Sequence, residues 1–365
     1  MPPVTRSKPS SSRAVQVTVP AVLAAMVVAW APAQIRADKP SPAVVKYERE
    51  MDAAIDKALI YLAKNQLQDG SFACPWPGNT AVTSLSVMAF LAKGYTPGTG
   101  PYGKVIDRAI DHVLACQHPS GLLVSRRGQS HGPMYCHGIS TLMLSEVSGM
   151  VTPERQKKID AAIAKALKLI LVAQKIPKRG HHRGGWRYQH TSADSDISCT
   201  GWQLMALRSA RNSGTPVPKE AIDAAVAYVL GLRCPDGGFG YTDPNGPGLA
   251  RTGTALLCLE LCGKHADKAA IDGGEWILKH MPNAFGGGHF YYGLYYCSQG
   301  MFQLGGKYWE QWAAWMYETT LKFQQKDGSW PAEGGPAGPA GPCYSTAMSV
   351  LAMSVSYRQL PIYQR

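Results

Sequence analysis

The chain has 365 residues and a formal net charge of +12, with 45% apolar and 17% charged residues. This composition excludes disorder as the general state of the chain and is typical of a folded globular protein. A positive charge of this size favours partners such as acidic small molecules, lipid headgroups or nucleic acid.

The first 33 residues have the layout of a secretory signal. Arg6, Lys8 and Arg13 precede an apolar run over 15–30, and Ala-Pro-Ala follows at 31–33. We expect cleavage near Ala33, a linker over 34–43, and an exported protein, periplasmic or secreted. An uncleaved membrane anchor is the alternative, although a span needs about 20 apolar residues. No later segment is comparable, so we expect no integral membrane span after cleavage. Export also argues against nucleic acid as a partner.

From residue 44 to residue 361 the sequence predicts a single all-α domain of six helix pairs. The first member of each pair is amphipathic: Met51, Ile55, Leu59 and Leu62 fall on one stripe of a 3.6-residue helix. Similar helices are predicted over 102–116, 153–174, 218–232, 268–281 and 308–325. The second members are apolar nearly all round, as helices buried on every side are. They are predicted over 80–92, 137–150, 198–210, 252–262, 292–304 and 345–356.

Glycine turns separate the two members of each pair. Residues 66–72 read Gln-Leu-Gln-Asp-Gly-Ser-Phe, and residues 324–330 read Gln-Gln-Lys-Asp-Gly-Ser-Trp. Repeats at a period of roughly 40 to 60 residues indicate units that bury their apolar faces only against their neighbours. We therefore predict two concentric layers of helices closed into a ring around a central cavity. The aromatic residue after each turn is expected to fill the gap between neighbouring pairs, namely Phe72, Trp186, Phe239, Phe290 and Trp330.

The repeats resemble the α/α-toroid superfamily that contains squalene–hopene cyclases and protein prenyltransferase β subunits. Segments 66–72 and 324–330 are similar to the glutamine–tryptophan repeats of the cyclases, and 290–292 and 341–345 to two prenyltransferase segments. Three further segments resemble exported bacterial proteins that carry these repeats, namely 134–138, 184–188 and 196–203. The resemblance implies an α/α toroid over about residues 44–360. It does not fix the reaction, because one fold hosts many chemistries.

The best candidates for chemistry stand where the inner helices begin, since those positions face one mouth of a closed ring. Helix N-termini there carry unsatisfied N–H groups that suit an anion. Asp194 and Asp196 resemble the first positions of the acidic segment with which cyclases protonate an alkene, although Ile197 replaces the acid that follows there. The alternative role of Asp196 is to cap a helix. His137, with Asp194 and Asp196, completes the predicted catalytic candidates.

A second group of candidates would bind a ligand. Arg251 opens an otherwise apolar helix, so its charge requires a partner, either Asp196 or an anionic group of a ligand. The aromatic side chains offer surface to a carbocation, a hydrophobic ligand or a sugar ring, or else pack the core. The predicted ligand-binding residues are Arg251, Tyr291, Tyr292, Tyr295, Tyr344 and Trp202.

No metal or other cofactor is predicted. Zinc is the alternative that the residue types leave open, because Cys136, His137 and Cys343 are of the kinds that hold it. Cys343 matches a zinc ligand of the prenyltransferases, but Gly341 and Tyr292 stand where that family has its other ligands. The nine cysteines cannot all pair, and their spacing does not define disulfides.

Three functions agree with these patterns. The first is a cyclase- or prenyltransferase-like protein that binds or transforms an isoprenoid or other lipid-like ligand in the cavity. The second is a carbohydrate-active toroid, which would place two carboxylates along a groove. The third is a non-catalytic module that binds a protein partner. A hydrophobic or anionic small molecule is therefore the expected ligand of the first, and whether the protein is an enzyme stays open.

Overall fold

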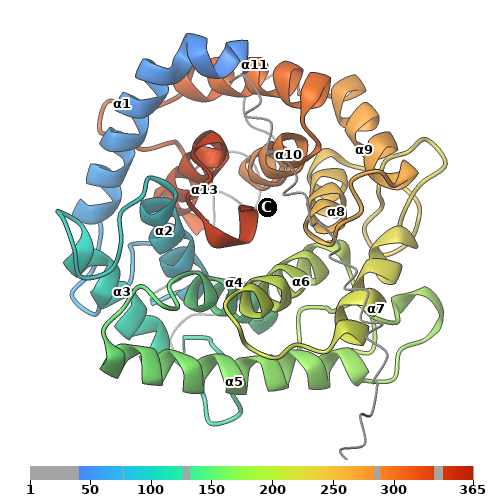
Figure 1. Ribbon diagram of the computed structural model, residues 1–365, viewed down its shortest axis with the longest axis horizontal. Coiled ribbons are helices and arrows are strands. Elements are labelled where there is room, and N and C mark those ends of the chain that lie inside the picture. Colours follow the sequence, from blue (N-terminus) through green and yellow to red (C-terminus); the bar gives the residue numbers. More distant parts are fainter. Residues whose placement is uncertain (1–40, 77, 126–131, 283–287, 333–339, 365) are drawn as a thin grey trace, which may run out of the picture. The chain divides into compact units, whose positions relative to one another are not determined.

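Helices of two kinds alternate along the chain and form two layers (Figure 1). The structure is a computed structural model that describes residues 41–76, 78–125, 132–282, 288–332 and 340–364. The predicted signal segment lies outside the described residues. Residues 40–365 form one compact unit, and the description below concerns this unit alone. None of its described helices is both long and apolar enough to cross a membrane.

The outer layer consists of amphipathic helices that bury one stripe and expose the other. In α1 the buried stripe includes Met51, Ile55, Leu59 and Leu62, which confirms the predicted periodicity. The outer helices are α1 (Pro42–Lys64), α3 (Gly103–Ala115), α5 (Pro153–Lys175), α7 (Lys219–Leu230), α9 (Lys268–Lys279) and α11 (Gly306–Lys322).

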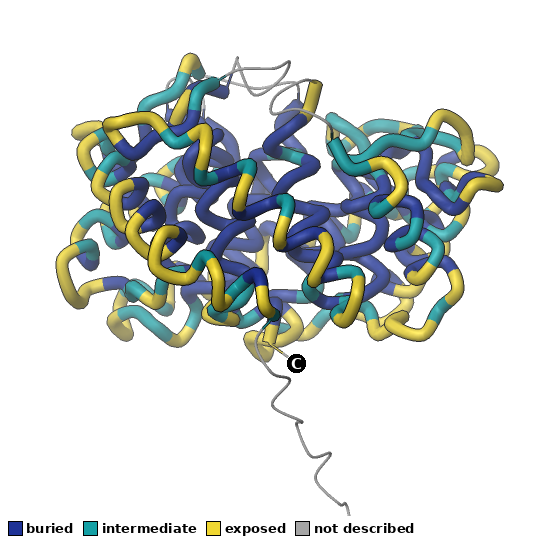
Figure 2. Tube along the Cα trace, turned by 90° about the horizontal axis from the view of Figure 1, so that it is seen from above, coloured by how far each residue is buried: buried dark blue, intermediate teal, exposed yellow. Residues whose placement is uncertain are grey.

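The inner layer is buried almost completely, as the dark tube in Figure 2 shows. Every residue of α2 is buried, because its small and apolar side chains face neighbours on all sides. The inner helices are α2 (Thr80–Ala92), α4 (Pro133–Glu146), α6 (Ile197–Asn212), α8 (Leu249–Leu261), α10 (Phe290–Leu304) and α13 (Pro342–Met353). Each packs against the next, and α13 packs against α2, so the inner ring is closed.

The predicted fold is confirmed, and most helix boundaries differ from the predicted ones by one to four residues. Helix α4 begins at Pro133 rather than at residue 137, and α13 begins at Pro342 rather than at residue 345. Proline is favoured in the first turn of a helix, because it lacks the N–H that would be unsatisfied there. As a result Tyr135 and Tyr344 belong to first helical turns.

A glutamine in the repeated turn forms a hydrogen bond that links one helix pair to the next. Gln66 Nε2 donates to Gly70 O within its own turn and to Val105 O, at 2.8 Å, in α3. Gln324 Nε2 makes the same contact with Ala54 O of α1, at 2.7 Å, and thereby joins the last pair to the first. Gly328 has φ +93°, and a Cβ there would lie 2.4 Å from Lys57 O. Only glycine therefore fits this close approach without rearrangement.

Candidate functional site

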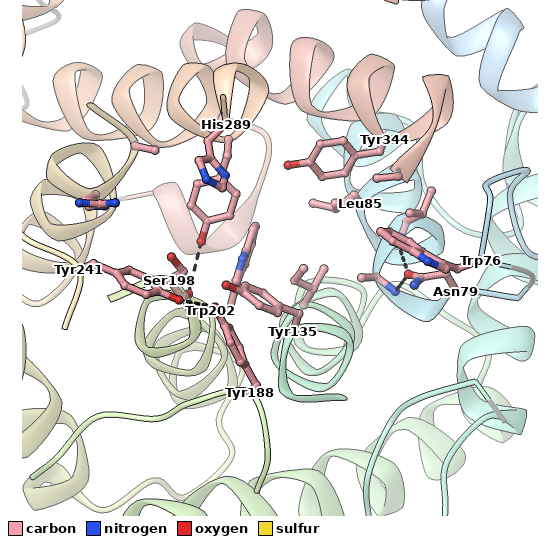
Figure 3. Close-up of a pocket in the computed structure, with 17 residues that line it drawn as sticks. Trp76, Asn79, Leu85, Tyr135, Tyr188, Ser198, Trp202, Tyr241, His289 and Tyr344 are labelled. Carbon is pink, nitrogen blue, oxygen red and sulfur yellow. Dashed lines mark hydrogen bonds between the residues drawn. The ribbon is translucent and has the colours of Figure 1, made fainter. Parts of the chain in front are cut away.

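A cavity of about 370 Å³ opens among the N-terminal ends of the inner helices. Side chains from the first turns of all six inner helices contribute to its wall, as the sequence predicted for one mouth of the ring (Figure 3). Most of the large side chains in the wall are aromatic: Trp76, Tyr135, Tyr188, Trp202, Tyr241, Tyr292 and Tyr344. The polar side chains in the wall are Asn79, Ser198, Arg251 and His289. No Asp or Glu is among the lining residues that the structure describes.

Of the predicted ligand-binding residues, four line the cavity and two do not. Arg251, Tyr292, Tyr344 and Trp202 lie in the wall. Tyr291 is buried behind it and donates its hydroxyl to Pro331 O at 2.6 Å, which joins α10 to the next turn.

Tyr295 is the other predicted ligand-binding residue that does not line the cavity. It is buried directly behind Trp202, with the two rings stacked at 5.6 Å between centroids and 11° between planes. Tyr295 thus supports the wall instead of forming it.

Several residues of the wall were not predicted from the sequence. Tyr188 and Tyr241 stand two residues after the aromatic of their repeat turns, Trp186 and Phe239. This shared register is a sequence signal that would have found both. His289 precedes α10 with φ +64°, a left-handed conformation that is uncommon for residues other than glycine. No sequence pattern indicates that conformation.

Two guanidinium groups share one tyrosine at the edge of the cavity. Arg187 Cζ lies 4.6 Å from the ring centroid of Tyr188 and 5.3 Å from that of Tyr241. Arg251 Cζ lies 5.4 Å from the Tyr241 ring. The hydroxyls of Tyr188 and Tyr241 are hydrogen-bonded to each other. These cation–π contacts hold positive charge beside the aromatic wall.

Asp196 is the N-cap of α6. Its Oδ1 accepts from Cys199 N at 2.8 Å, and its Oδ2 lies 3.5 Å from Arg187 Nε without a hydrogen bond in the described structure. Burial raises the pKa of this carboxyl to about 6, against the opposing effects of the Cys199 N–H and of Arg187. Asp194 also lies near Arg187, with its Oδ2 3.6 Å from the same Nε. Asp196 is thus paired with Arg187 and not with Arg251, and neither aspartate lines the cavity.

Replacing Asp196 separates its role as a cap from a role as an acid. An asparagine amide oxygen also caps helices, so we expect D196N to change the free energy of unfolding by no more than about 1 kcal/mol. D196A leaves the Cys199 N–H without its partner and is expected to cost about 2 kcal/mol. Thermal unfolding of both variants measures this difference. An equal decrease in the free energy of unfolding of D196N and D196A would contradict the capping role.

His137 is fully buried in α4 and does not reach the cavity. Its Nδ1 accepts from Leu123 N at 3.1 Å, and its Nε2 lies 3.2 Å from Ala166 O. Burial lowers the pKa of the imidazole to about 4, so it is neutral at physiological pH. In four other turns that the structure describes, a threonine hydroxyl accepts the corresponding backbone N–H, as Thr200 does from Trp186 at 3.0 Å. His137 therefore has the structural role that threonine has in other repeats, and we leave it out of the proposed ligand site.

The two cysteines considered as zinc ligands, Cys136 and Cys343, both lie near Cys74. Cys136 Sγ is 3.8 Å from Asn79 Oδ1, and Cys343 is buried near Cys74. Burial raises the pKa of the Cys343 thiol to about 12, whereas zinc binds the thiolate. The described residues contain no group of three or more His, Cys, Asp or Glu side chains that could hold a metal ion. No disulfide joins any of the nine cysteines, all of which lie in the described residues.

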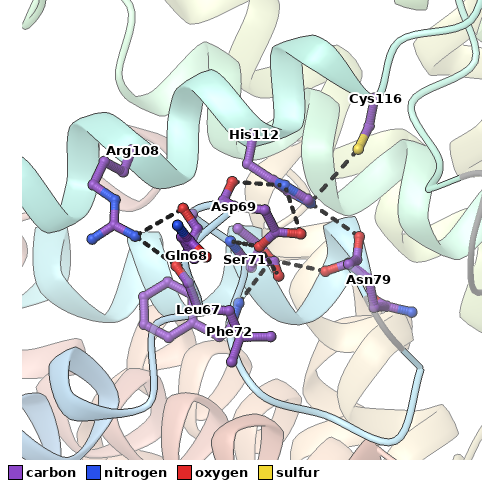
Figure 4. Close-up of polar contacts among 12 residues, drawn as sticks. Leu67, Gln68, Asp69, Ser71, Phe72, Asn79, Arg108, His112 and Cys116 are labelled. Atoms are coloured by element: carbon purple, nitrogen blue, oxygen red, sulfur yellow. Dashed lines mark hydrogen bonds and ion pairs between the residues drawn. The ribbon is translucent and has the colours of Figure 1, made fainter.

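A second polar cluster joins the first repeat turn to α3 (Figure 4). His112 Nδ1 lies 3.1 Å from Asp69 O, and its Nε2 lies 3.1 Å from Gly78 O and 3.6 Å from Cys116 Sγ. Arg108 donates to Leu67 O at 2.6 Å. The contacts of His112 and Arg108 with backbone carbonyls hold the turn on the outer helix. These contacts stabilise the fold, and the cluster does not line the cavity.

The ring of paired helices defines the fold as an α/α toroid, which solved structures of known proteins share. The type II terpene cyclase MstE from Scytonema, in complex with its substrate geranylgeranyl dihydroxybenzoate, is 14% identical, with a TM-score of 0.55 over 87% of this chain and 100% of the cyclase. Identity at this level establishes the fold alone.

Toroids of carbohydrate enzymes are similar to the same degree. A family 76 glycoside hydrolase from a bovine Bacteroides thetaiotaomicron strain is 13% identical, with a TM-score of 0.58 over 84% of this chain and 77% of the hydrolase. A possible member of the GH105 family from Salmonella enterica is 12% identical, with a TM-score of 0.55 over 85% of this chain and 94% of that protein. Neither a family model nor a curated protein matches the sequence.

Proposed function

We propose that this toroid binds an isoprenoid or other lipid-like ligand in its central cavity, with the apolar chain inside and an oxygen-bearing head at Arg251. The cavity volume of about 370 Å³ is within the range of small-molecule sites. We further propose, from the N-terminal segment, that the mature protein is exported. The observation that carries the proposed ligand class is the combination of an aromatic wall with unsatisfied hydrogen-bond donors.

Two buried donors in the wall have no acceptor in the described part of the chain. They are Asn79 Nδ2 and Trp202 Nε1. A buried donor without an acceptor costs about 1–3 kcal/mol; an oxygen atom of the ligand's head would remove this cost at Asn79, and a water molecule would remove it at Trp202. Arg251 adds positive charge at the same cavity. The wall is thus suited to oxygen acceptors, and most of all to an anionic group.

The rest of the ligand should be apolar. The aromatic rings of Tyr135, Trp202, Tyr292 and Tyr344 form most of the wall surface. Burying a ligand's carbon chain against such rings gains about 25 cal/mol for each Å² removed from water. The geranylgeranyl group in the substrate of MstE is an apolar chain of this kind. That likeness supports the ligand class but assigns no reaction.

A carbohydrate ligand is the second candidate, because aromatic side chains also stack on sugar rings and two of the similar toroids belong to carbohydrate-active classes. Glycoside hydrolysis requires a pair of carboxyl groups beside the scissile bond. Since the described wall contains neither Asp nor Glu, we restrict the proposal to binding. A non-catalytic module that binds a protein partner is the third candidate. A cavity that binds neither prenyl probes nor oligosaccharides would favour it.

Replacing Arg251 by glutamine should weaken the binding of an acidic ligand and spare a neutral one. The purified protein would be titrated by calorimetry with farnesoic acid and with farnesol, which share the apolar chain and differ in the head. We expect R251Q to weaken binding of the acid about tenfold, since a charged hydrogen bond contributes about 1.5–3 kcal/mol. The affinity of R251Q for farnesol should fall less than threefold.

Arg211 offers a matched control, because it is an exposed arginine at the end of α6 and does not line the cavity. R211Q should bind both probes as the unmodified protein does. Equal weakening of acid and alcohol in R251Q would contradict the role of Arg251. Binding of oligosaccharides but of neither prenyl probe would reject the lipid-like ligand in favour of the carbohydrate alternative.

A further inference from the structure

The end of the inner ring opposite the cavity mouth is occupied by the chain's own C-terminal segment. After α13, residues 360–364 cross this end and include the short helix η3 (Pro361–Tyr363), which packs against α6. Figure 1 shows the C-terminal end inside the ring of inner helices. Leu360, Ile362 and Tyr363 are all buried. The segment thus closes the inner layer where the inner helices end.

Buried polar contacts hold this segment in place. Glu146, the last residue of α4, accepts from Ile362 N at 3.1 Å and from the hydroxyl of Ser209. Gln303 Nε2, near the end of α10, donates to Tyr363 O at 3.1 Å. The C-terminal segment is therefore attached to three different inner helices, α4, α6 and α10.

A direct line of contacts leads from this segment to the cavity. The Tyr363 hydroxyl is hydrogen-bonded to the Tyr295 hydroxyl. The Tyr295 ring stacks on the indole of Trp202, and Trp202 lines the cavity. Since Tyr295 does not line the cavity, Trp202 is the last of these three side chains before the ligand space.

Trp202 belongs to the deepest part of the cavity wall. It is the sixth residue of α6, so at 1.5 Å per residue it lies about 7.5 Å along the helix from its first residue. Leu85 of α2 and Ile139 of α4 also line the cavity, at similar positions in their helices. Lining residues of the other inner helices stand in or just before the first turn. These three side chains therefore form the floor, and the indole is the largest of them.

We propose that the C-terminal segment sets the depth of the cavity, because Tyr363 and Tyr295 hold the Trp202 indole as its floor. The proposal rests on the proposed function in one respect, that the occupant of the cavity is an apolar chain. Tyr295 and Tyr363 are positioning residues that act through Trp202. The length of chain that fits is then limited by this floor and not by the mouth.

The test measures affinity against ligand length. Calorimetry on the full chain would use isoprenoid carboxylic acids of two, three and four isoprene units. Trp202→Leu should strengthen binding of the longest probe at least tenfold over the shortest, relative to the unmodified protein, because the added isoprene unit is then removed from water. The double variant Y295F/Y363F loses the hydroxyl pair without changing ring size. It should shift the length preference in the same direction, by about threefold.

Tyr317→Phe is the matched control. Tyr317 is also a buried tyrosine with a hydroxyl contact near the end of α13, 3.4 Å from Met353 O, but it belongs to α11 and does not stack on Trp202. The control should lower stability slightly and leave the length preference unchanged. The same length profile in all variants would overturn the proposal.

A second measurement keeps this test independent of the proposed function. The protein would be labelled with 5-fluorotryptophan, and the ¹⁹F resonance of Trp202 would be assigned by its loss in W202F. Its chemical shift should change in Y295F and in Y363F and should not change in Y317F. If the unmodified protein binds none of the isoprenoid acids, the proposed function fails, and this resonance alone decides whether the tail positions the floor. An unmoved resonance in Y295F and Y363F would overturn the positioning role.

Discussion

Replacing His137 by alanine is expected to lower the free energy of unfolding by about 4 kcal/mol. The substitution leaves the buried Leu123 N–H without its acceptor and removes the ring nitrogen beside Ala166 O. Each unsatisfied buried group costs about 1–3 kcal/mol, and the space left by the imidazole adds to the loss. Denaturant unfolding of H137A at pH 7 measures the effect.

The repeat itself provides the control for this prediction. Threonine accepts the equivalent N–H in other turns, for example Thr252 from Phe239 at 3.0 Å and Thr346 from Trp330 at 3.2 Å. His137→Thr restores an acceptor for Leu123 N but not the contact with Ala166 O. We therefore expect H137T to recover about half of the loss. Wild-type stability in H137A would contradict a structural role and return His137 to the functional candidates.

The contribution of Glu146 to stability should fall as the pH rises from about 4.5 to 7. Burial raises the pKa of this carboxyl from 4.5 to about 7, although hydrogen bonds from Ser209 and Ile362 oppose the shift. In this window the Glu146 carboxyl is protonated more in the folded protein than in the unfolded chain. The stabilisation is therefore complete below about pH 4.5 and is lost as the pH rises through 7. At 1.36 kcal/mol for each pKa unit, the full change is about 3 kcal/mol.

Glu146→Gln removes this titration and keeps an oxygen acceptor for Ile362 N. The stability of E146Q relative to the unmodified protein should therefore increase as the pH rises from 5 to 8. Glu310→Gln, an exposed position on α11, is the control and should show a constant difference. A pH-independent difference for E146Q would show that Glu146 does not titrate in this window.

The architecture could be predicted from the sequence alone, because helix periodicity is a local property. Amphipathic and fully apolar segments predicted which helices lie outside and which inside, and α2 has the predicted ends, Thr80 and Ala92. The starts of the inner helices were correctly expected to face one mouth, where Arg251 lies. Both predictions follow from burial of apolar side chains, which depends little on the identity of distant neighbours.

The partners of the polar groups could not be predicted from the sequence. Asp196 pairs with Arg187 across the turn that precedes α6, although Arg251 was an equally suitable partner by charge. His137 was a candidate by residue type, and its two backbone partners come from a different turn and a different helix. Tyr295 and Tyr363 meet over 68 positions of sequence. Such pairings depend on directional contacts between repeats that the ring brings together, and no local pattern specifies them.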